Sequence, residues 1–189
     1  MGIFGSGKKD MAGSKPFGRG RFAPPCAATL ELKSFGTKQS QDPDTEGDTL
    51  LITEFGVVDY KGVKYISFNA EDKTEKNPTG ELSSEGLYNT GDTMSDVVNT
   101  DDKKYGMVNS KEMCIAIKHA FERQRKNRGP DYSIQMAEKE LTNEEANGWI
   151  DDPEKNKELV GLLFKLEAWN VQRTNSQTKK PDNFTAKKY

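Results

Sequence analysis

Apolar and polar residues alternate along several stretches of the chain, which is the pattern of β-strands with one buried face. In the first stretch, CAATLELKSFGTK (26–38), Ala28, Leu30 and Leu32 fall on one side, whereas the charged residues and Phe35 fall on the other. A second β-rich stretch, TLLITEFGVVDY (49–60), contains a glycine that indicates a bulge or a bend. Further strands are predicted at 61–70, 92–99, 162–173 and 183–189.

The period changes to that of a helix in NSKEMCIAIKHAFERQRKNRGP. Ser110 is placed to cap the helix, and Gly129-Pro130 is placed to stop it, so a helix is predicted over 110–128. The apolar positions that recur at helical spacing are Met113, Ile117, Ala120 and Phe121. A shorter helix is predicted near 143–150, because Thr142 and Glu145 have the spacing of a capping box.

The order of these elements predicts a mainly β chain with helices (α+β). We expect a five-stranded OB-fold-like barrel with one main helix between strands three and four. An open α+β sheet carrying its helices on one face is the alternative, and the absence of alternating β–α units argues against a doubly wound parallel sheet. Residues 26–189 would form one domain, with 1–25 as a flexible basic Gly/Pro-rich arm and 61–85 as an acidic insertion.

The net charge of −2 conceals a strong segregation of charge along the 189 residues. Residues 1–40 carry seven Lys and Arg against two Asp and Glu, and residues 103–189 carry 17 against 13. Residues 41–102 carry four against 15. Because a local basic face acts on a polyanion whatever the net charge, a nucleic-acid partner remains compatible with this composition.

The residue types argue against several classes of function. Cys26 and Cys114 lie far apart and, with His119 as the single histidine, make no metal-ligand cluster, and two separated cysteines favour a reducing compartment. No apolar run is long enough to span a membrane. No nucleophile elbow, Cys/His pairing or HExxH motif is present. We therefore expect no enzyme activity, no metal and no cofactor.

The last 28 residues hold the most informative chemistry. Along 162–173, Phe164 and Leu166 point to one side, while Lys165, Trp169 and Arg173 point to the other. Exposed aromatic rings stack on bases and cations follow phosphates in proteins that bind single strands. The loop TNSQTKKPDN would add Lys179 and Lys180 at a connection that OB-folds use for binding. The alternative interpretation is that Trp169 packs under a loop and the cations are ordinary surface. The candidate DNA-binding residues are Lys33, Phe35, Lys38, Lys165, Trp169, Arg173, Lys179, Lys180, Lys187 and Tyr189.

Four segments resemble a family of small phage-encoded single-stranded-DNA-binding proteins with an OB-fold. They are the Gly-rich start with GRGRFAPPCAATLELKSF, the second strand LLITEFGVVDY, the segment NTGDTMSDVVNTDDKKYGMVNSKEMCIAIKHAF, and the closing hairpin LVGLLFKLEAWNVQRTNSQTKKPDNFTAKKY. The resemblance covers roughly residues 18–60 and 86–189. APP replaces the Pro-Gly of the family, and 61–85 is an insertion relative to it.

The resemblance implies non-sequence-specific binding of single-stranded DNA during phage DNA replication or recombination, in the cytoplasm of the infected host cell. We expect no membrane partner, whereas self-association is left open. The acidic residues 71–102 would recruit a phage or host replication protein, or compete with DNA for the basic face. The alternatives are a virion structural or accessory protein that uses its N-terminal arm for subunit contacts, and a metal-dependent nuclease.

Overall fold

A computed structural model describes residues 3, 26–62, 67–69, 75–76, 88–174, 179 and 181–189. For residues 26, 62, 67–69, 75–76, 169–174 and 181–188 it describes the backbone alone. The predicted N-terminal arm, apart from residue 3, and most of the predicted insertion 61–85 lie outside the described residues.

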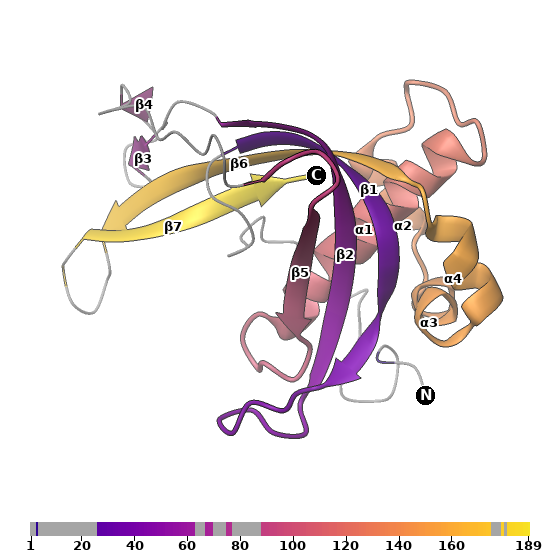
Figure 1. Cartoon of the computed structure of the whole chain (residues 1–189), viewed down its shortest axis with the longest axis horizontal. Coiled ribbons are helices and arrows are strands. Elements are labelled where there is room, and N and C mark those ends of the chain that lie inside the picture. The colour runs from indigo at the N-terminus through magenta and orange to yellow at the C-terminus, as the bar shows by residue number, and fades with distance from the viewer. Residues whose placement is uncertain are drawn as a thin grey trace. The chain divides into compact units, whose positions relative to one another are not determined.

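Strands and helices both contribute to the described part of the chain (Figure 1). The strands are β1 (Cys26–Gln39), β2 (Thr49–Gly62), β3 (Ser67–Asn69), β4 (Glu75–Lys76), β5 (Thr93–Asn99), β6 (Leu163–Thr174) and β7 (Pro181–Lys188). The helices are α1 (Gly106–Gln124), α2 (Ile134–Glu140), α3 (Asn143–Asp151) and α4 (Pro153–Leu159). The long predicted strands are therefore confirmed, but the described residues hold seven strands and four helices rather than five strands and one main helix.

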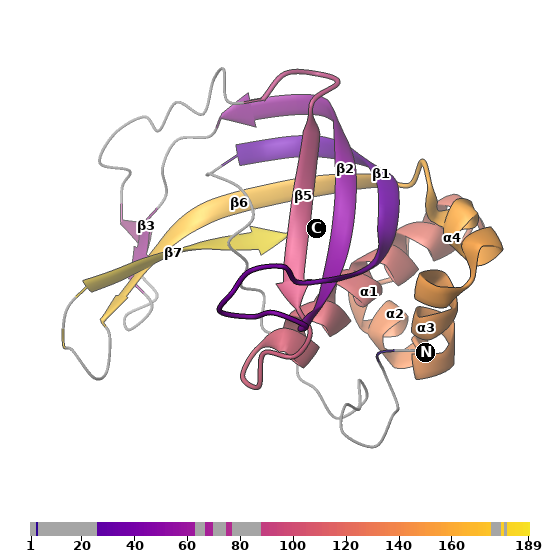
Figure 2. The ribbon, with the colours of Figure 1, turned by 60° about the horizontal axis from the view of Figure 1, so that its bottom comes forward.

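Six strands are hydrogen-bonded in the order β4-β3-β6-β1-β2-β5. The seventh strand, β7, is hydrogen-bonded to β6. β1, β2, β5 and β6 make a curled antiparallel sheet, so the chain is of mixed α and β class (Figure 2). The chain divides into two compact units. The first comprises Met1–Phe17, Glu31–Gly56 and Thr93–Phe164, and the second comprises Gly18–Leu30, Val57–Asp92 and Lys165–Tyr189.

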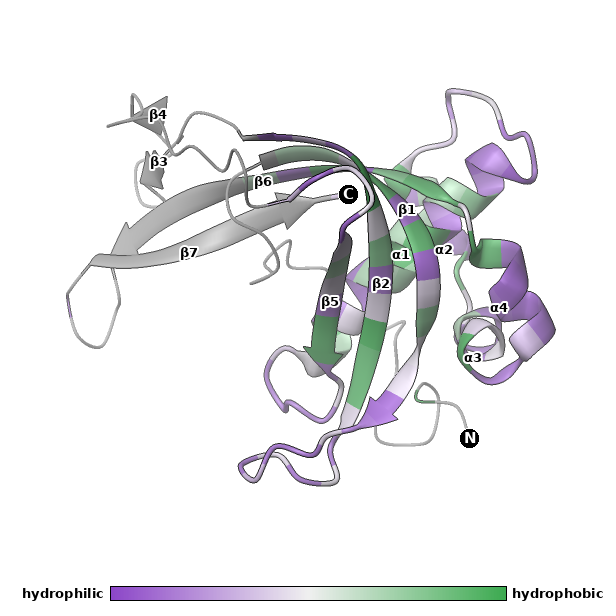
Figure 3. Ribbon diagram, in the orientation of Figure 1, coloured by the Kyte–Doolittle hydropathy of each residue, from purple (hydrophilic) through white to green (hydrophobic). Residues whose placement is uncertain are grey.

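The core of the first unit follows from alternation along its strands. β2 pairs with β5 from Leu50↔Asn99 to Gly56↔Thr93, and every second residue of each strand is buried. Phe55 of β2 meets Phe164 edge to face, with the ring centroids 5.4 Å apart. Bands of hydrophobic and hydrophilic residues alternate along β1 in Figure 3, as expected for a sheet with one buried face.

The apolar face of α1 is buried as predicted, at Met113, Ile117, Ala120 and Phe121. The predicted start of this helix was wrong. α1 begins at Gly106, where a Cβ atom would lie 2.5 Å from the carbonyl oxygen of Asn99 and 2.8 Å from that of Thr100. Ser110 does not cap the helix, because it is buried inside it and its Oγ donates to the Gly106 carbonyl at 2.7 Å. The helix ends at Gln124, short of the predicted end at residue 128.

Side-chain caps start the three shorter helices, which gather with α1 on one side of the strands of the first unit (Figure 2). Ser133 accepts from the Met136 amide at the start of α2, and Thr142 accepts from the Glu145 amide at the start of α3, which confirms the predicted helix and its Thr142 cap. Asp152 accepts from the two amides that follow Pro153 in α4. Neither α2 nor α4 was predicted.

Two buried lysines link α1 to its neighbours. Lys118 Nζ lies 2.7 Å from Glu145 of α3 and 3.3 Å from Glu122 of α1. Lys111 Nζ lies 3.1 Å from Glu138 of α2. Burial by itself lowers the pKa of Lys118, but the hydrogen bonds and charges of Glu145 and Glu122 outweigh it, and the pKa is raised overall. The charged ammonium is therefore the form that the fold stabilises.

Cys114 is a fully buried thiol on α1. Burial, and secondarily the negative charge of Glu145, raises the pKa of the Cys114 thiol. The thiolate is the reactive form of cysteine, so the side chain serves here as a packing residue.

The second unit is built on the ladder of β6 and β7, whose register runs from Glu167↔Lys188 to Thr174↔Pro181. β3 joins β6 as a parallel neighbour through Phe68↔Val171 and Asn69↔Gln172. At the end of β2, the Val57 amide donates to the Asp92 carbonyl at 2.8 Å. The rings of Tyr60 and Tyr88 pack together there, with their centroids 5.3 Å apart.

Candidate nucleic-acid interface

The residues predicted to bind DNA are divided between the two units. The first unit holds Lys33, Phe35 and Lys38. The second holds Lys165, Trp169, Arg173, Lys179, Lys187 and Tyr189. Lys180 lies outside the described residues. Each group is therefore a separate candidate surface.

Phe35 was assigned to the wrong side of β1. Its side chain is only 3% exposed, so it belongs to the core of the first unit and has no free ring face for a base. The burial pattern changes phase between Leu32 and Phe35, which are three residues apart and both buried. Asn156 of α4 donates its side-chain amide to the Phe35 carbonyl and, at 2.7 Å, to the Trp149 carbonyl. The helices thus hold this part of β1, and Phe35 is removed from the candidate site.

Both lysines of β1 are exposed, as a phosphate contact requires. The ammonium group of Lys33 lies 2.8 Å from Glu31 Oε2, and its side chain remains 49% exposed. Lys38 lies near the end of the strand, where Thr37 and Gln39 are exposed as well. An exposed pair such as Lys33–Glu31 contributes little to stability, so Lys33 can exchange its partner at low cost.

The register of the hairpin groups the residues of β6 and β7 by face. Directly opposed residues of an antiparallel pair share a face. Trp169 is opposite Ala186, Val171 is opposite Phe184, and Arg173 is opposite Asp182. Phe184 therefore lies on the face of Trp169, diagonal to it in the ladder. The sequence analysis missed Phe184, because alternation within one strand does not reveal which residue of the next strand it faces.

The same register separates two lysines that are adjacent in sequence. Lys187 is opposite Ala168, which is buried, whereas Lys188 is opposite Glu167, which is exposed. Lys188 rather than Lys187 thus shares the face of Trp169. Lys187 stays a predicted phosphate contact, on the face opposite to that of Trp169.

β3 extends the aromatic face across a third strand. Phe68 is the parallel partner of Val171, and Val171 is opposite Phe184. Parallel partners also share a face of the sheet, so Phe68, Val171 and Phe184 form a row across β3, β6 and β7, with Trp169 beside it. We call these four residues the aromatic row.

Charges of both signs accompany the aromatic row. In the ladder, Arg173 is opposite Asp182 and Glu167 is opposite Lys188, so two basic positions are paired with acidic ones. Lys165 is exposed on β6. Lys179 is also exposed, and its φ of 55° is in the left-handed region that favours glycine. Tyr189, at the end of the chain, is half-buried.

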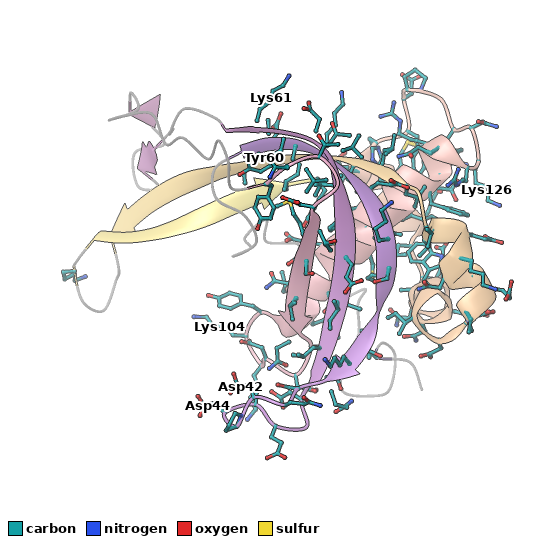
Figure 4. The ribbon with its side chains drawn as sticks, in the orientation of Figure 1. Asp42, Asp44, Tyr60, Lys61, Lys104 and Lys126 are labelled. Atoms are coloured by element: carbon teal, nitrogen blue, oxygen red, sulfur yellow. The ribbon has the colours of Figure 1, made fainter. Side chains whose placement is uncertain are left out.

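Several carboxylates of the acidic residues 41–102 accept hydrogen bonds that hold the loops in place. Asp48 accepts from the Asn99 side chain at 2.7 Å, and Asp101 accepts from the Thr49 amide at 2.8 Å, so both join β2 to the end of β5. Asp102 accepts from the amides of Lys104 and Tyr105 ahead of α1. Figure 4 shows Asp42 and Asp44 in the connection between β1 and β2, where both are exposed. Within the part of the chain that the structure describes, no group of three His, Cys, Asp or Glu could hold a metal ion.

No family profile, curated protein or solved structure matches this chain. None of the helices among the described residues is both long enough and apolar enough to cross a membrane.

Proposed function

We propose that this chain binds single-stranded DNA without sequence preference and coats it during phage DNA replication or recombination. It would work without catalysis in the cytoplasm of the infected host cell. Bases would stack on the aromatic row, and cations of the hairpin would neutralise phosphates. Each stacked base contributes roughly 1–3 kcal/mol, and stacking tolerates every base because each has a π-face.

The register that groups Trp169 with Phe184 and Phe68 supports this proposal most directly. Three aromatic positions on one face of neighbouring strands would offer rings to successive bases. Lys165 and Lys179 are exposed in the same unit and add cations for the backbone.

We further propose that the long strands belong to an OB-fold-like barrel. β3 and β4 fall within the predicted insertion 61–85. Without them, five strands remain in the continuous order β5-β2-β1-β6-β7, and α1 follows the third of these along the chain. That is the count and helix position expected of such a barrel. The acidic residues 71–102 would serve a basic replication partner.

Tryptophan fluorescence during titration with oligo-dT tests the proposed function. The only other indole, Trp149, is 4% exposed and packs against Phe121, so a bound base cannot reach it. We expect oligo-dT to quench the emission, and Trp169→Ala to weaken binding by about 1–3 kcal/mol whatever the base composition.

A Trp149→Phe background assigns the quenching to Trp169. Binding without quenching in that background would move the stacking site away from Trp169. No binding at all, at any salt concentration, would reject the proposed function in favour of a virion structural or accessory protein whose N-terminal arm contacts other subunits.

A further inference from the structure

We propose that the first unit carries a second phosphate-binding surface, formed by Lys33 of β1 and by Arg123, Arg125 and Lys126 at the end of α1. We call it the α1-end cluster. It would take the sugar–phosphate backbone of a single strand, and it deepens the proposed function, on which it rests. All four side chains are exposed.

Two members of this cluster, Arg125 and Lys33, lie near one carboxylate, and Arg123 and Lys126 lie within two residues of Arg125 in the chain. Arg125 Nη2 lies 3.3 Å from the place that a Cβ atom would occupy at Gly161, and Glu31 Oε1 lies 3.8 Å from the same place. The other oxygen of Glu31 lies 2.8 Å from Lys33 Nζ. Arg125 and Glu31 thus both lie beside Gly161, and Lys33 pairs with the same Glu31 carboxylate.

Two glycines make this arrangement possible. Gly161 has a φ of +87°, which is unfavourable for any residue with a side chain, so position 161 itself places no side chain against Arg125. At Gly56 a Cβ atom would lie 2.6 Å from Lys33 Cε. The stem of Lys33 thus lies flat over β2.

The end of α1 is fixed to the sheet rather than left on a loose loop. Gln124 donates its side-chain amide to the Leu163 carbonyl at 2.7 Å and accepts from the Leu163 amide at 2.9 Å. Arg125 donates to the Val160 carbonyl at 3.1 Å. A guanidinium has five N–H donors, so one such bond leaves the others for a phosphate oxygen. These hydrogen bonds hold the end of α1, which carries Arg123, Arg125 and Lys126, in a fixed position.

Charge favours an anion here over the rest of the first unit. Within the described part of the chain, Glu31 is the one carboxylate within ion-pair distance of the four cations, and it pairs with Lys33. Arg128, further along the chain, is committed to Glu140 at 2.8 Å and Glu122 at 3.9 Å and is not part of the cluster. In the same unit, the connection between β1 and β2 exposes Asp42, Asp44 and Glu46 and would repel a phosphate.

The helix dipole offers a simpler explanation for cations at this place. It favours positive charge at the C-terminus, but its effect is confined to the last turn. It therefore accounts for Arg123, the basic residue of the last turn of α1. It does not account for Lys33, which lies on a strand. Figure 4 labels Lys126 beyond the end of α1, where its ammonium also lies 5.3 Å from the centre of the Phe121 ring.

The salt dependence of oligo-dT binding tests the proposal in the full chain. A Lys33→Gln, Arg123→Gln, Lys126→Gln triple variant should reduce the slope of log K against log salt by up to about 2, taking about 0.7 per phosphate contact on a single strand. The matched control replaces exposed lysines elsewhere in the first unit, Lys104, Lys139 and Lys157, by Gln. It makes the same change in net charge and should leave the slope unchanged.

The outcomes separate this proposal from the proposed function. Equal slopes for the triple variant and its control, with binding retained, would overturn the α1-end cluster and leave the hairpin as the binding element. Failure of the wild-type chain to bind oligo-dT would reject both. Arg123→Gln with Lys126→Gln alone changes no hydrogen bond that holds α1, so a slope reduction of about 1.4 in this double variant provides a check against misfolding.

Discussion

Phe184 is the residue whose importance depends most on the hairpin register. Its strand partner is Val171, whereas the next residue, Thr185, is opposite Asn170 and so belongs to the other face. We expect Phe184→Ala to weaken oligo-dT binding by about 1–3 kcal/mol, as for the loss of one stacked base, whereas Thr185→Ala should change it little. Fluorescence titration measures both. Equal losses in the two variants would mean that the hairpin acts through its stability rather than through one face.

Phe35 shows why the buried face of a strand cannot always be predicted from the alternation of residues in that strand alone. Its alternation in the sequence is regular, and it places Phe35 with Lys33. The buried positions are instead Leu32 and Phe35, and α4 contacts the strand at Phe35 through Asn156. That contact joins residues 121 positions apart in the chain, so no local pattern records it. The exposed lysines of β1 could be predicted from the sequence, but the phase of its aromatic residue could not.

Among the elements, the ion pairs of Lys118 are the connection between α1 and α3 that is easiest to test. The side chains of Lys118 and Glu122 are 9% and 13% exposed, and Glu145 is 27% exposed. Lys118→Met would leave two carboxylates near each other without the ammonium. We expect it to lower the free energy of unfolding by about 3 kcal/mol, at the low end for a broken buried pair because Glu145 still reaches water.

Lys157→Met is the matched control for that substitution, measured by urea denaturation. Lys157 pairs with Glu154 at 2.7 Å, but both side chains are at least 70% exposed. Such a pair is worth less than about 1 kcal/mol. A loss below 1 kcal/mol for Lys118→Met as well would mean that water screens the Lys118 pairs despite their burial.

The elements were predictable wherever their signal is local. Strand alternation located β1, β2, β5 and β6, and the capping box located α3. The Asp152-Pro153 start of α4 is a local signal too, and it was overlooked. The true start of α1 was not predictable, because Gly106 is required by the carbonyls of Asn99 and Thr100 on a neighbouring segment. The pairing of β3 with β6 is equally non-local.

For the molecule as a whole, alkaline pH should be destabilising. Burial, and then the charge and hydrogen bond of Glu140, raises the pKa of Tyr132, and the pKa of Lys118 is raised as well. When the folded-state pKa is the higher one, the stability is present below the unfolded-state value and is lost as the pH rises through the folded-state value. Stability due to these groups should therefore fall above about pH 10, near the reference values for Tyr and Lys.

Urea denaturation between about pH 8 and pH 11, on both sides of those reference values, measures this dependence. Tyr132→Phe should make the alkaline decline shallower, because the phenol can no longer ionise. It also removes the 3.2 Å hydrogen bond to Glu140, while the ring can still stack on His119. An unchanged decline in Tyr132→Phe would assign it to other groups.

Because Cys114 is buried, its reaction with a thiol reagent reports how often the packing around α1 opens. A thiol with no solvent exposure and a raised pKa cannot be alkylated while α1 is packed, so modification must wait for a fluctuation that exposes it. With Cys26 replaced by Ser, the rate of labelling with a maleimide would follow the population of open molecules. Comparing that rate with and without oligo-dT would tell whether a bound strand tightens the helical side of the protein or leaves it untouched.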